Sequence, residues 1–262
     1  MSIQEGSRSM PFYPLPPLSF FIIKGEMKIS YLSLSGKRCT VQFYGCNFRC
    51  KACFALDKMN TYTEITPEGL LTEIKQFNIE EVMLAGGEPT IYKKELLEFI
   101  KLSDIKTTLS TNGSLLDSVF VREMENACLD EIHIDLKAFT PELHEWYTGE
   151  SNESVLNAIK LLNKSKLNFE VMTVFIPGIV EKEEIERIAK FLSGIDDKIK
   201  YKIIRYVPVC NVSRRPTEEE IKEAVSIAKK YLCTVTSSLE ERTHPLKSIR
   251  LYIPSQAEST LT

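Results

Sequence analysis

Apolar residues recur along the chain in two alternating patterns, short runs and longer amphipathic segments. The short runs are rich in β-favouring residues, whereas the longer segments repeat apolar positions every three or four residues, as an α-helix does. The predicted strands are Cys39–Tyr44, Glu81–Ala85, Lys106–Ser110, Glu131–Leu136, Phe169–Phe175 and Lys200–Val207. The predicted helices are Thr66–Phe77, Lys93–Lys101, Leu115–Asn126, Ser154–Asn163, Lys182–Leu192 and Thr217–Tyr231.

This order of elements predicts an α/β fold built from about six strand–helix units. Strands that alternate with helices form a parallel sheet with right-handed crossovers. The pattern does not decide between a flat, doubly wound sheet and a partial barrel, but in both arrangements ligands bind at the carboxyl ends of the strands. We expect a leader and short hairpin over residues 1–37, the strand–helix series over 38–233, and a C-terminal extension over 234–262 with room for one added strand.

Composition narrows the class of protein. Of 262 residues, 43% are hydrophobic and 26% are charged, as in an ordinary globular protein. The net charge of -3 gives no strong field for nucleic acid, and no segment reaches the roughly 20 apolar residues that span a bilayer. The apolar stretch 18–23 follows prolines and lacks a small-residue cleavage site, so it does not resemble a signal peptide. We therefore expect a cytoplasmic protein without membrane or nucleic-acid partners.

Three of the seven cysteines lie within eight residues, directly after the first predicted strand. Cys46, Cys50 and Cys53 have the spacing C-x3-C-x2-C, and thiolates are the ligands of iron–sulfur clusters. Three ligands would leave one iron of a four-iron cluster open. The alternatives are chance and zinc, but structural zinc takes four ligands, and Cys39 lies in an apolar strand. The remaining cysteines are predicted to be core thiols: Cys39, Cys128, Cys210 and Cys233.

Polar or glycine-rich motifs also follow the next three strands. Leu84 to Thr90 contains Gly-Gly-Glu-Pro, where glycines allow a close backbone approach, although a tight turn alone would explain them. The third strand ends in Ser-Thr-Asn-Gly (110–113), also an ordinary turn sequence. The fourth ends in His133, Asp135 and Lys137, which alternation places on one side of the strand. Asp135 and Lys137 could form a purely structural pair, and a structural role is favoured for His133.

Together these motifs resemble the radical S-adenosylmethionine (SAM) superfamily, and particularly the activating enzymes of glycyl-radical enzymes. The resemblance continues from Asp135 to Leu162 and through the Ile-Pro-Gly turn at 176–178. It implies a partial (β/α)6 barrel of the TIM type and a [4Fe–4S] cluster on Cys46, Cys50 and Cys53. It also implies contacts with SAM from six residues: Gly86, Gly87, Glu88, Asn112, Asp135 and Lys137.

The implied reaction is reductive cleavage of SAM to a 5′-deoxyadenosyl radical, with electrons from a flavodoxin or ferredoxin type of donor. The expected substrate is a glycyl-radical enzyme; a peptide, small molecule or nucleoside is the alternative. The alternative that is not an enzyme is a non-catalytic iron–sulfur electron carrier. The chain departs from the activase pattern at three places: Ala52 replaces an aromatic residue, Ser110 replaces an Asp that binds a cation, and Arg205-Tyr206 replaces a Tyr-His pair. Arg205 either lines the substrate mouth or pairs with a carboxylate.

Overall fold

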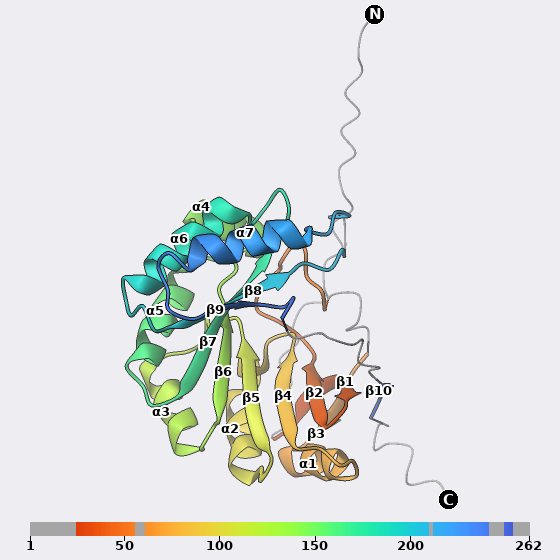
Figure 1. Cartoon of the computed structure of the whole chain (residues 1–262). Helices are drawn as coiled ribbons and strands as arrows, with labels where there is room; N and C mark the ends of the chain where they lie inside the picture. The colour runs from red at the N-terminus through yellow and green to blue at the C-terminus, as the bar shows by residue number, and fades with distance from the viewer. Residues whose placement is uncertain (1–24, 56–60, 210–211, 241–248, 254–262) are drawn as a thin grey trace, which may run out of the picture.

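The computed structural model describes residues 25–55, 61–209, 212–240 and 249–253, whose strands form one curved, ten-stranded sheet (Figure 1). The strands are β1 (Met27–Ser35), β2 (Arg38–Phe43), β3 (Thr63–Ile65), β4 (Glu81–Gly86), β5 (Lys106–Thr111), β6 (Glu131–Asp135), β7 (Asn168–Phe175), β8 (Lys200–Arg205), β9 (Val235–Ser237) and β10 (Ile249–Leu251). The helices are α1 (Pro67–Lys75), the 3₁₀ helix η2 (Pro89–Tyr92), α2 (Lys93–Leu102), α3 (Ser118–Asn126), α4 (Pro141–Thr148), α5 (Glu153–Asn163), α6 (Lys182–Ser193) and α7 (Glu218–Ala228). No helix in these ranges is long and apolar enough to cross a membrane.

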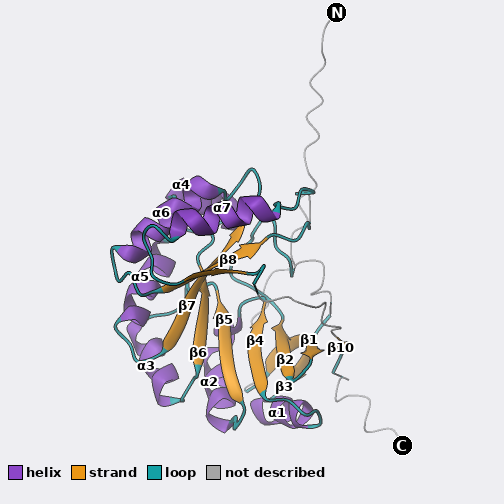
Figure 2. Ribbon diagram, viewed as in Figure 1, coloured by secondary structure: helices purple, strands orange, loops and turns teal. Residues whose placement is uncertain are grey.

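The centre of the sheet is the predicted strand–helix series. Strands β2, β4, β5, β6, β7 and β8 are neighbours in that order and are all parallel. The helices lie along the outer side of the curved sheet (Figure 2). The sheet remains open, because its order runs from β10 at one edge to β9 at the other. The expected partial barrel is confirmed.

The two edges of the sheet come from segments outside this series. Strand β1 pairs antiparallel with β2, with β3 and with β10, and β9 pairs parallel with β8. Strands β1 and β2 form a hairpin around Gly36, whose φ of 60° suits the tight turn, so its second strand is the first strand of the predicted series. Residues 1–24 of the expected leader and hairpin (1–37) lie outside the described residues. The domain boundaries at 37 and 234 remain predictions.

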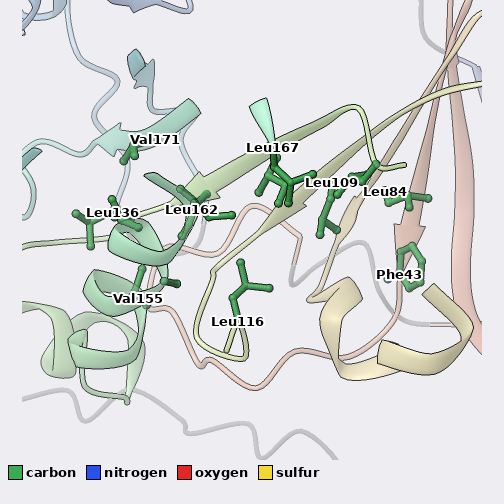
Figure 3. Close-up of a cluster of buried hydrophobic side chains, with 14 of the residues drawn as sticks. Phe43, Leu84, Leu109, Leu116, Leu136, Val155, Leu162, Leu167 and Val171 are labelled. Carbon is green, nitrogen blue, oxygen red and sulfur yellow. The ribbon is translucent and has the colours of Figure 1, made fainter. Parts of the chain in front are cut away.

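The hydrophobic core lies between the sheet and the helices that cover it. Successive parallel strands contribute Phe43, Leu84 and Leu109, each fully buried (Figure 3). Helix α5 packs Val155 and Leu162 into the same cluster. Because side chains alternate along a strand, the residues between these apolar positions point to the inner side of the curve. That side is left for polar groups and for the site.

Helix α4 was not among the predicted elements. It follows β6, with Pro141 in its first turn, and ends at Gly149, which has a φ of 82°. Proline at the start and a left-handed glycine after the end are the usual boundaries of a helix. Those two residues were the signal for α4 in the sequence.

Candidate functional site

The cysteine loop begins where β2 ends, at the carboxyl edge of the parallel sheet. Its first residue after Tyr44 is Gly45, which turns the chain with a φ of 87°. Cys46, Cys50 and Cys53 are each partly exposed. Phe48 and Ala52, which lie between them, are buried. The loop is therefore anchored by its apolar residues, and its thiols remain accessible.

The last turn of α4 holds the backbone of this loop. Arg49 N donates to Thr148 O at 2.7 Å, and Lys51 N donates to Tyr147 O at 3.0 Å. The carbonyls at the end of a helix have no partners within the helix, so they are free to accept these bonds. The Arg49 guanidinium also donates to Cys46 O at 2.6 Å. These bonds fix the loop before any cofactor binds.

The three thiols lie near enough to influence one another. Burial, followed by the nearby Glu88, Cys50 and Cys53, raises the pKa of Cys46 to about 12. Burial raises the pKa of Cys50 to about 11, although the Lys137 ammonium acts in the opposite direction. No three such side chains within the described ranges form a group that could hold a single metal ion. A cubane cluster has a different requirement, since each thiolate binds its own iron.

The Gly-Gly-Glu-Pro turn packs directly on the base of the cysteine loop. Gly87 N donates to Phe43 O at 3.0 Å, and Glu88 N donates to Gly45 O at 2.8 Å. A Cβ atom on Gly87 would lie 1.8 Å from Gly45 O, and one on Gly86 would lie 2.6 Å from Phe43 N. Only glycine permits this approach. The two motifs that the sequence places after neighbouring strands therefore form one structural unit.

The Glu88 side chain is turned into the protein. It is 1% exposed, and its carboxylate accepts hydrogen bonds from the backbone and hydroxyl of Thr90, from the Thr111 hydroxyl and from Asn112 N. Burial raises the pKa of Glu88, while these four donors act to lower it. The carboxylate thus links the end of β4 to the end of β5.

Asn112 joins the end of β5 to the cysteine loop. Its amide nitrogen donates to Asn47 Oδ1 at 2.8 Å and lies 3.9 Å from Cys46 Sγ. Ser114, two residues further, contacts both asparagine side chains. Sequence reasoning missed Asn47 and Ser114, because nothing in their spacing shows that they meet.

Asp135 and Lys137 form an ion pair at the end of β6, with Lys137 Nζ 2.5 Å from Asp135 Oδ2. Their side chains are about one-fifth exposed, at 22% and 18%. Burial alone would lower the pKa of Lys137, but the charges of Asp135 and Cys50 hold it well above its usual value. Asp135 Oδ1 is buried and has no partner among the described residues. His133 lies 3.8 Å from Glu131 Oε1, lower on the same strand.

Helix α4 adds two buried side chains that were not predicted as site residues. Tyr147 is 3% exposed, and burial raises its pKa, with Lys137 opposing and Cys50 reinforcing the shift. His144 is fully buried and packs edge-on against Phe48 at 5.6 Å. His144 Nδ1 lies 2.7 Å from Glu150 O, whereas Nε2 has no partner within the described ranges. Both residues support the wall beside the thiols.

Arg205, at the end of β8, is tied to the protein. Its Nε donates to Pro216 O at 2.8 Å, and Nη1 lies 3.7 Å from Glu218 Oε1. Of the two alternatives for this residue, the structure has the carboxylate pair. The neighbouring Tyr206 is buried, and its hydroxyl donates to Val209 O at 2.8 Å.

The remaining cysteines fall into two groups. Cys39 is fully buried in β2, as predicted. The prediction of core thiols is wrong for Cys128 and Cys233, which are exposed. Cys128 follows α3 in a left-handed conformation (φ 62°), and Cys233 lies in the turn between α7 and β9. Cys210 lies outside the described residues.

The site can accommodate the groups that the resemblance implies. The loop offers three accessible thiols, the chemistry that an iron–sulfur cluster requires. Asp135 Oδ1 is a buried acceptor that a hydroxyl or ammonium group of a ligand would satisfy. The paired glycines bring the turn after β4 directly onto the base of the cysteine loop.

Comparisons with known proteins agree with this geometry. The family model of the radical SAM superfamily matches residues 41–192. A protein of Methanocaldococcus jannaschii, provisionally named a glycyl-radical enzyme activating enzyme, is 39% identical over 83% of this chain and 87% of its own length. The GTP 3′,8-cyclase of Peptoclostridium acidaminophilum is 29% identical over 79% of this chain and 66% of its own.

A solved structure shows the same fold. It is a domain of pyruvate-formate lyase-activating enzyme from Bacteroides vulgatus, with a TM-score of 0.53 and 21% identity, covering 60% of this chain and 98% of that domain. The family match spans more than half of the chain and includes the cysteine loop, both glycines and the Asp135–Lys137 pair. The chain is a member of the radical SAM superfamily, a class of enzymes that use a [4Fe–4S] cluster and SAM.

Proposed function

We propose that this enzyme generates a radical on a partner protein, in the manner of a glycyl-radical enzyme activating enzyme, with Cys46, Cys50 and Cys53 as the cluster ligands. The observation that carries the SAM chemistry is the packing of the Gly-Gly-Glu-Pro turn on the cysteine loop, where Gly87 leaves no room for a Cβ atom. When bound, the cluster and SAM supply one-electron cleavage to a 5′-deoxyadenosyl radical. A bare electron carrier would not need this second motif.

The residues of the chain then bind and orient SAM. The backbone of Gly86 and Gly87 is suited to the methionine end, because the two glycines are partly exposed and pack on the base of the cysteine loop. Lys137 supplies a cation for the carboxylate, and Asp135 Oδ1 an acceptor for a ribose hydroxyl. Glu88 and Asn112 are expected to hold the SAM-binding residues in place rather than to contact SAM, since their side chains already bond to the protein. Tyr147 and Phe48, both buried, shield the thiols on the protein side only.

The proposed partner, a glycyl-radical enzyme, follows from the relatedness of this chain to a named protein. The M. jannaschii relative matches most of this chain, and its name assigns glycyl-radical enzymes as its targets. A flavodoxin or ferredoxin type of donor would supply the electron near Arg49 and Lys51, the exposed cations of the cysteine loop. Attraction to an acidic donor would follow from their charge.

A second candidate is radical modification of a nucleotide or small molecule. The relatedness to GTP 3′,8-cyclase supports it, as does Arg205-Tyr206 in place of the Tyr-His pair of the activases. This candidate uses the same cluster and SAM residues and differs only in the substrate.

An electron paramagnetic resonance (EPR) experiment separates the two candidates. The reconstituted enzyme, dithionite and SAM are mixed under anaerobic conditions with a purified glycyl-radical enzyme from the same source. We expect a glycyl radical signal on the partner, and its loss when the partner's radical glycine is replaced by alanine. Formation of 5′-deoxyadenosine that GTP accelerates and the partner does not would overturn the activase proposal in favour of the second candidate.

A further inference from the structure

Three side chains beside the cysteine loop form a closed ring of hydrogen bonds. Asn112 Nδ2 donates to Asn47 Oδ1 at 2.8 Å, Asn47 Nδ2 donates to Ser114 Oγ at 2.7 Å, and Ser114 Oγ donates to Asn112 Oδ1 at 2.7 Å. Each member therefore donates once and accepts once within the ring. Asn47 lies between two cluster cysteines in the sequence, whereas Asn112 and Ser114 follow β5. The ring thus joins two strand ends across the site.

The ring uses nearly all the hydrogen-bonding capacity of Asn112. Its Oδ1 accepts from both the hydroxyl and the backbone N–H of Ser114, and one proton of its amide goes to Asn47. The same nitrogen lies 3.9 Å from Cys46 Sγ, within reach of a weak N–H···S bond for its second proton. Asn112 is only 6% exposed. A SAM molecule would find no free polar atom on this side chain.

The buried Glu88 carboxylate fixes the other end of the arrangement. It accepts from Asn112 N at 2.7 Å and from the Thr111 hydroxyl at 2.6 Å. The backbone of Asn112 is therefore held from one side, and its side chain from the other. A buried network in which every member is bonded holds one conformation.

We propose that Asn112 is a positioning residue of the cluster: the ring aims its amide N–H at the Cys46 sulfur and thereby raises the reduction potential of the [4Fe–4S] cluster. This inference rests on the proposed ligation of the cluster by Cys46. The N–H dipole presents its positive end to a sulfur that carries more negative charge after reduction. Hydrogen bonds to cluster sulfurs are among the factors that set these potentials. Asn47 and Ser114 act through Asn112.

A redox titration without SAM or substrate tests the proposal. The reconstituted wild type and Asn112→Ala are reduced in steps, and the EPR signal of the reduced cluster is measured at each potential. We expect the equilibrium constant for reduction to fall at least tenfold, a shift of 59 mV to more negative potential for one electron. Ser114→Ala, which opens the ring but keeps the amide, should shift in the same direction by less. Asn163→Ala, at the end of α5 and outside the ring, is the matched control.

The affinity for SAM distinguishes the proposed positioning role of Asn112 from a direct contact with SAM. We expect the dissociation constant of SAM to change less than twofold in Ser114→Ala and Asn112→Ala. An unchanged potential together with a tenfold weaker SAM affinity would overturn the proposal and make Asn112 a SAM contact. If Asn112→Ala does not load a cluster, Ser114→Ala decides by the same two measurements. Failure of the wild type to load a cluster would instead contradict the proposed ligation.

Discussion

The Glu88 and Asp135 carboxylates lie at the same edge of the sheet but have different surroundings. Four hydrogen bonds from the protein satisfy Glu88, which is 1% exposed. Asp135 has one oxygen on Lys137 and one buried oxygen without a partner in the described residues. A group whose bonds are complete stabilises the site, whereas a group with an open acceptor is available to a ligand. Substitution of Asp135 is therefore expected to change SAM affinity, and substitution of Glu88 the stability of the protein.

Replacing Asp135 by asparagine is expected to weaken SAM binding at least tenfold. The change keeps the size of the side chain but removes the charge that holds Lys137, and it replaces one of the two acceptor oxygens by an NH₂ donor. A hydrogen bond to a charged group contributes about 1.5–3 kcal/mol. Calorimetric titration of reconstituted enzyme with SAM measures the change. Wild-type affinity in Asp135→Asn would contradict a direct role in SAM binding.

Replacing Glu88 by glutamine is expected to lower the free energy of unfolding by about 1–3 kcal/mol, because the amide NH₂ would face donors instead of accepting from them. Urea unfolding of the apoprotein measures this loss. Glu98→Gln, on the partly exposed face of α2, is the control and should change stability little. Equal stabilities of Glu88→Gln and the control would show that the four bonds do not hold the turn.

Gly87→Ala tests the contact between the two motifs. The added Cβ atom would lie 1.8 Å from Gly45 O, so the base of the cysteine loop must move. We expect the variant to retain less than half of the iron that the wild type binds after reconstitution. Gly194→Ala is the matched control, since its Cβ would lie 3.4 Å from its nearest neighbours. Normal iron content in Gly87→Ala would show that the loop tolerates the displacement.

At the scale of the elements, α7 is fixed by its first turn. Thr217 and Glu220 form a capping box, and Nη1 and Nη2 of Arg214 each donate to the Glu220 carboxylate at 2.8 Å. The hydrogen bonds from Arg214 and from the backbone of Thr217 lower the pKa of Glu220 to about 2. A carboxyl group with a lowered pKa stabilises the fold above its unfolded value of 4.5 and loses that effect as the pH falls towards 2.

Glu220→Gln should therefore lower the free energy of unfolding by about 1 kcal/mol at pH 7, the usual contribution of a helix cap. The difference from the wild type should shrink between pH 4.5 and 3. Urea unfolding of both proteins at pH 7, 4.5 and 3 measures this difference in stability. Glu219→Gln, in the same turn, is the control. A difference that is independent of pH would contradict a role for the ionised carboxylate.

Some elements could be predicted from local sequence, and others could not. The six parallel strands follow from apolar runs and turn residues that lie next to each other in the chain. Strand β10 pairs with β1, more than 200 residues earlier, and β9 adds only three residues to the edge of the sheet. Such short strands have little local signal and exist because a neighbouring strand offers free N–H and C=O groups. Helix α4 differs, since Pro141 and Gly149 mark its start and its end in the sequence.

At the scale of the whole molecule, the parallel topology brings the motifs together. Cys46, Gly87, Asn112 and Asp135 each follow a different strand, and parallel strands end at one edge. The sequence therefore predicted which residues would meet. It did not predict that Asn47 and Ser114 would close a ring, because that contact depends on side-chain directions in two loops. Nor did it predict Cys128 and Cys233 at the surface. Both residues follow the end of a helix, where the apolar pattern no longer shows which way a side chain points.

If the three-cysteine loop holds the cluster that cleaves SAM, the anaerobically reconstituted enzyme should form 5′-deoxyadenosine with dithionite and SAM. This product can be measured directly. We predict product in the wild type and in Cys233→Ala, and none in Cys46→Ala, Cys50→Ala or Cys53→Ala. A wild type that loads its cluster but does not cleave SAM, or product that persists without these cysteines, would contradict SAM cleavage at the three-cysteine loop.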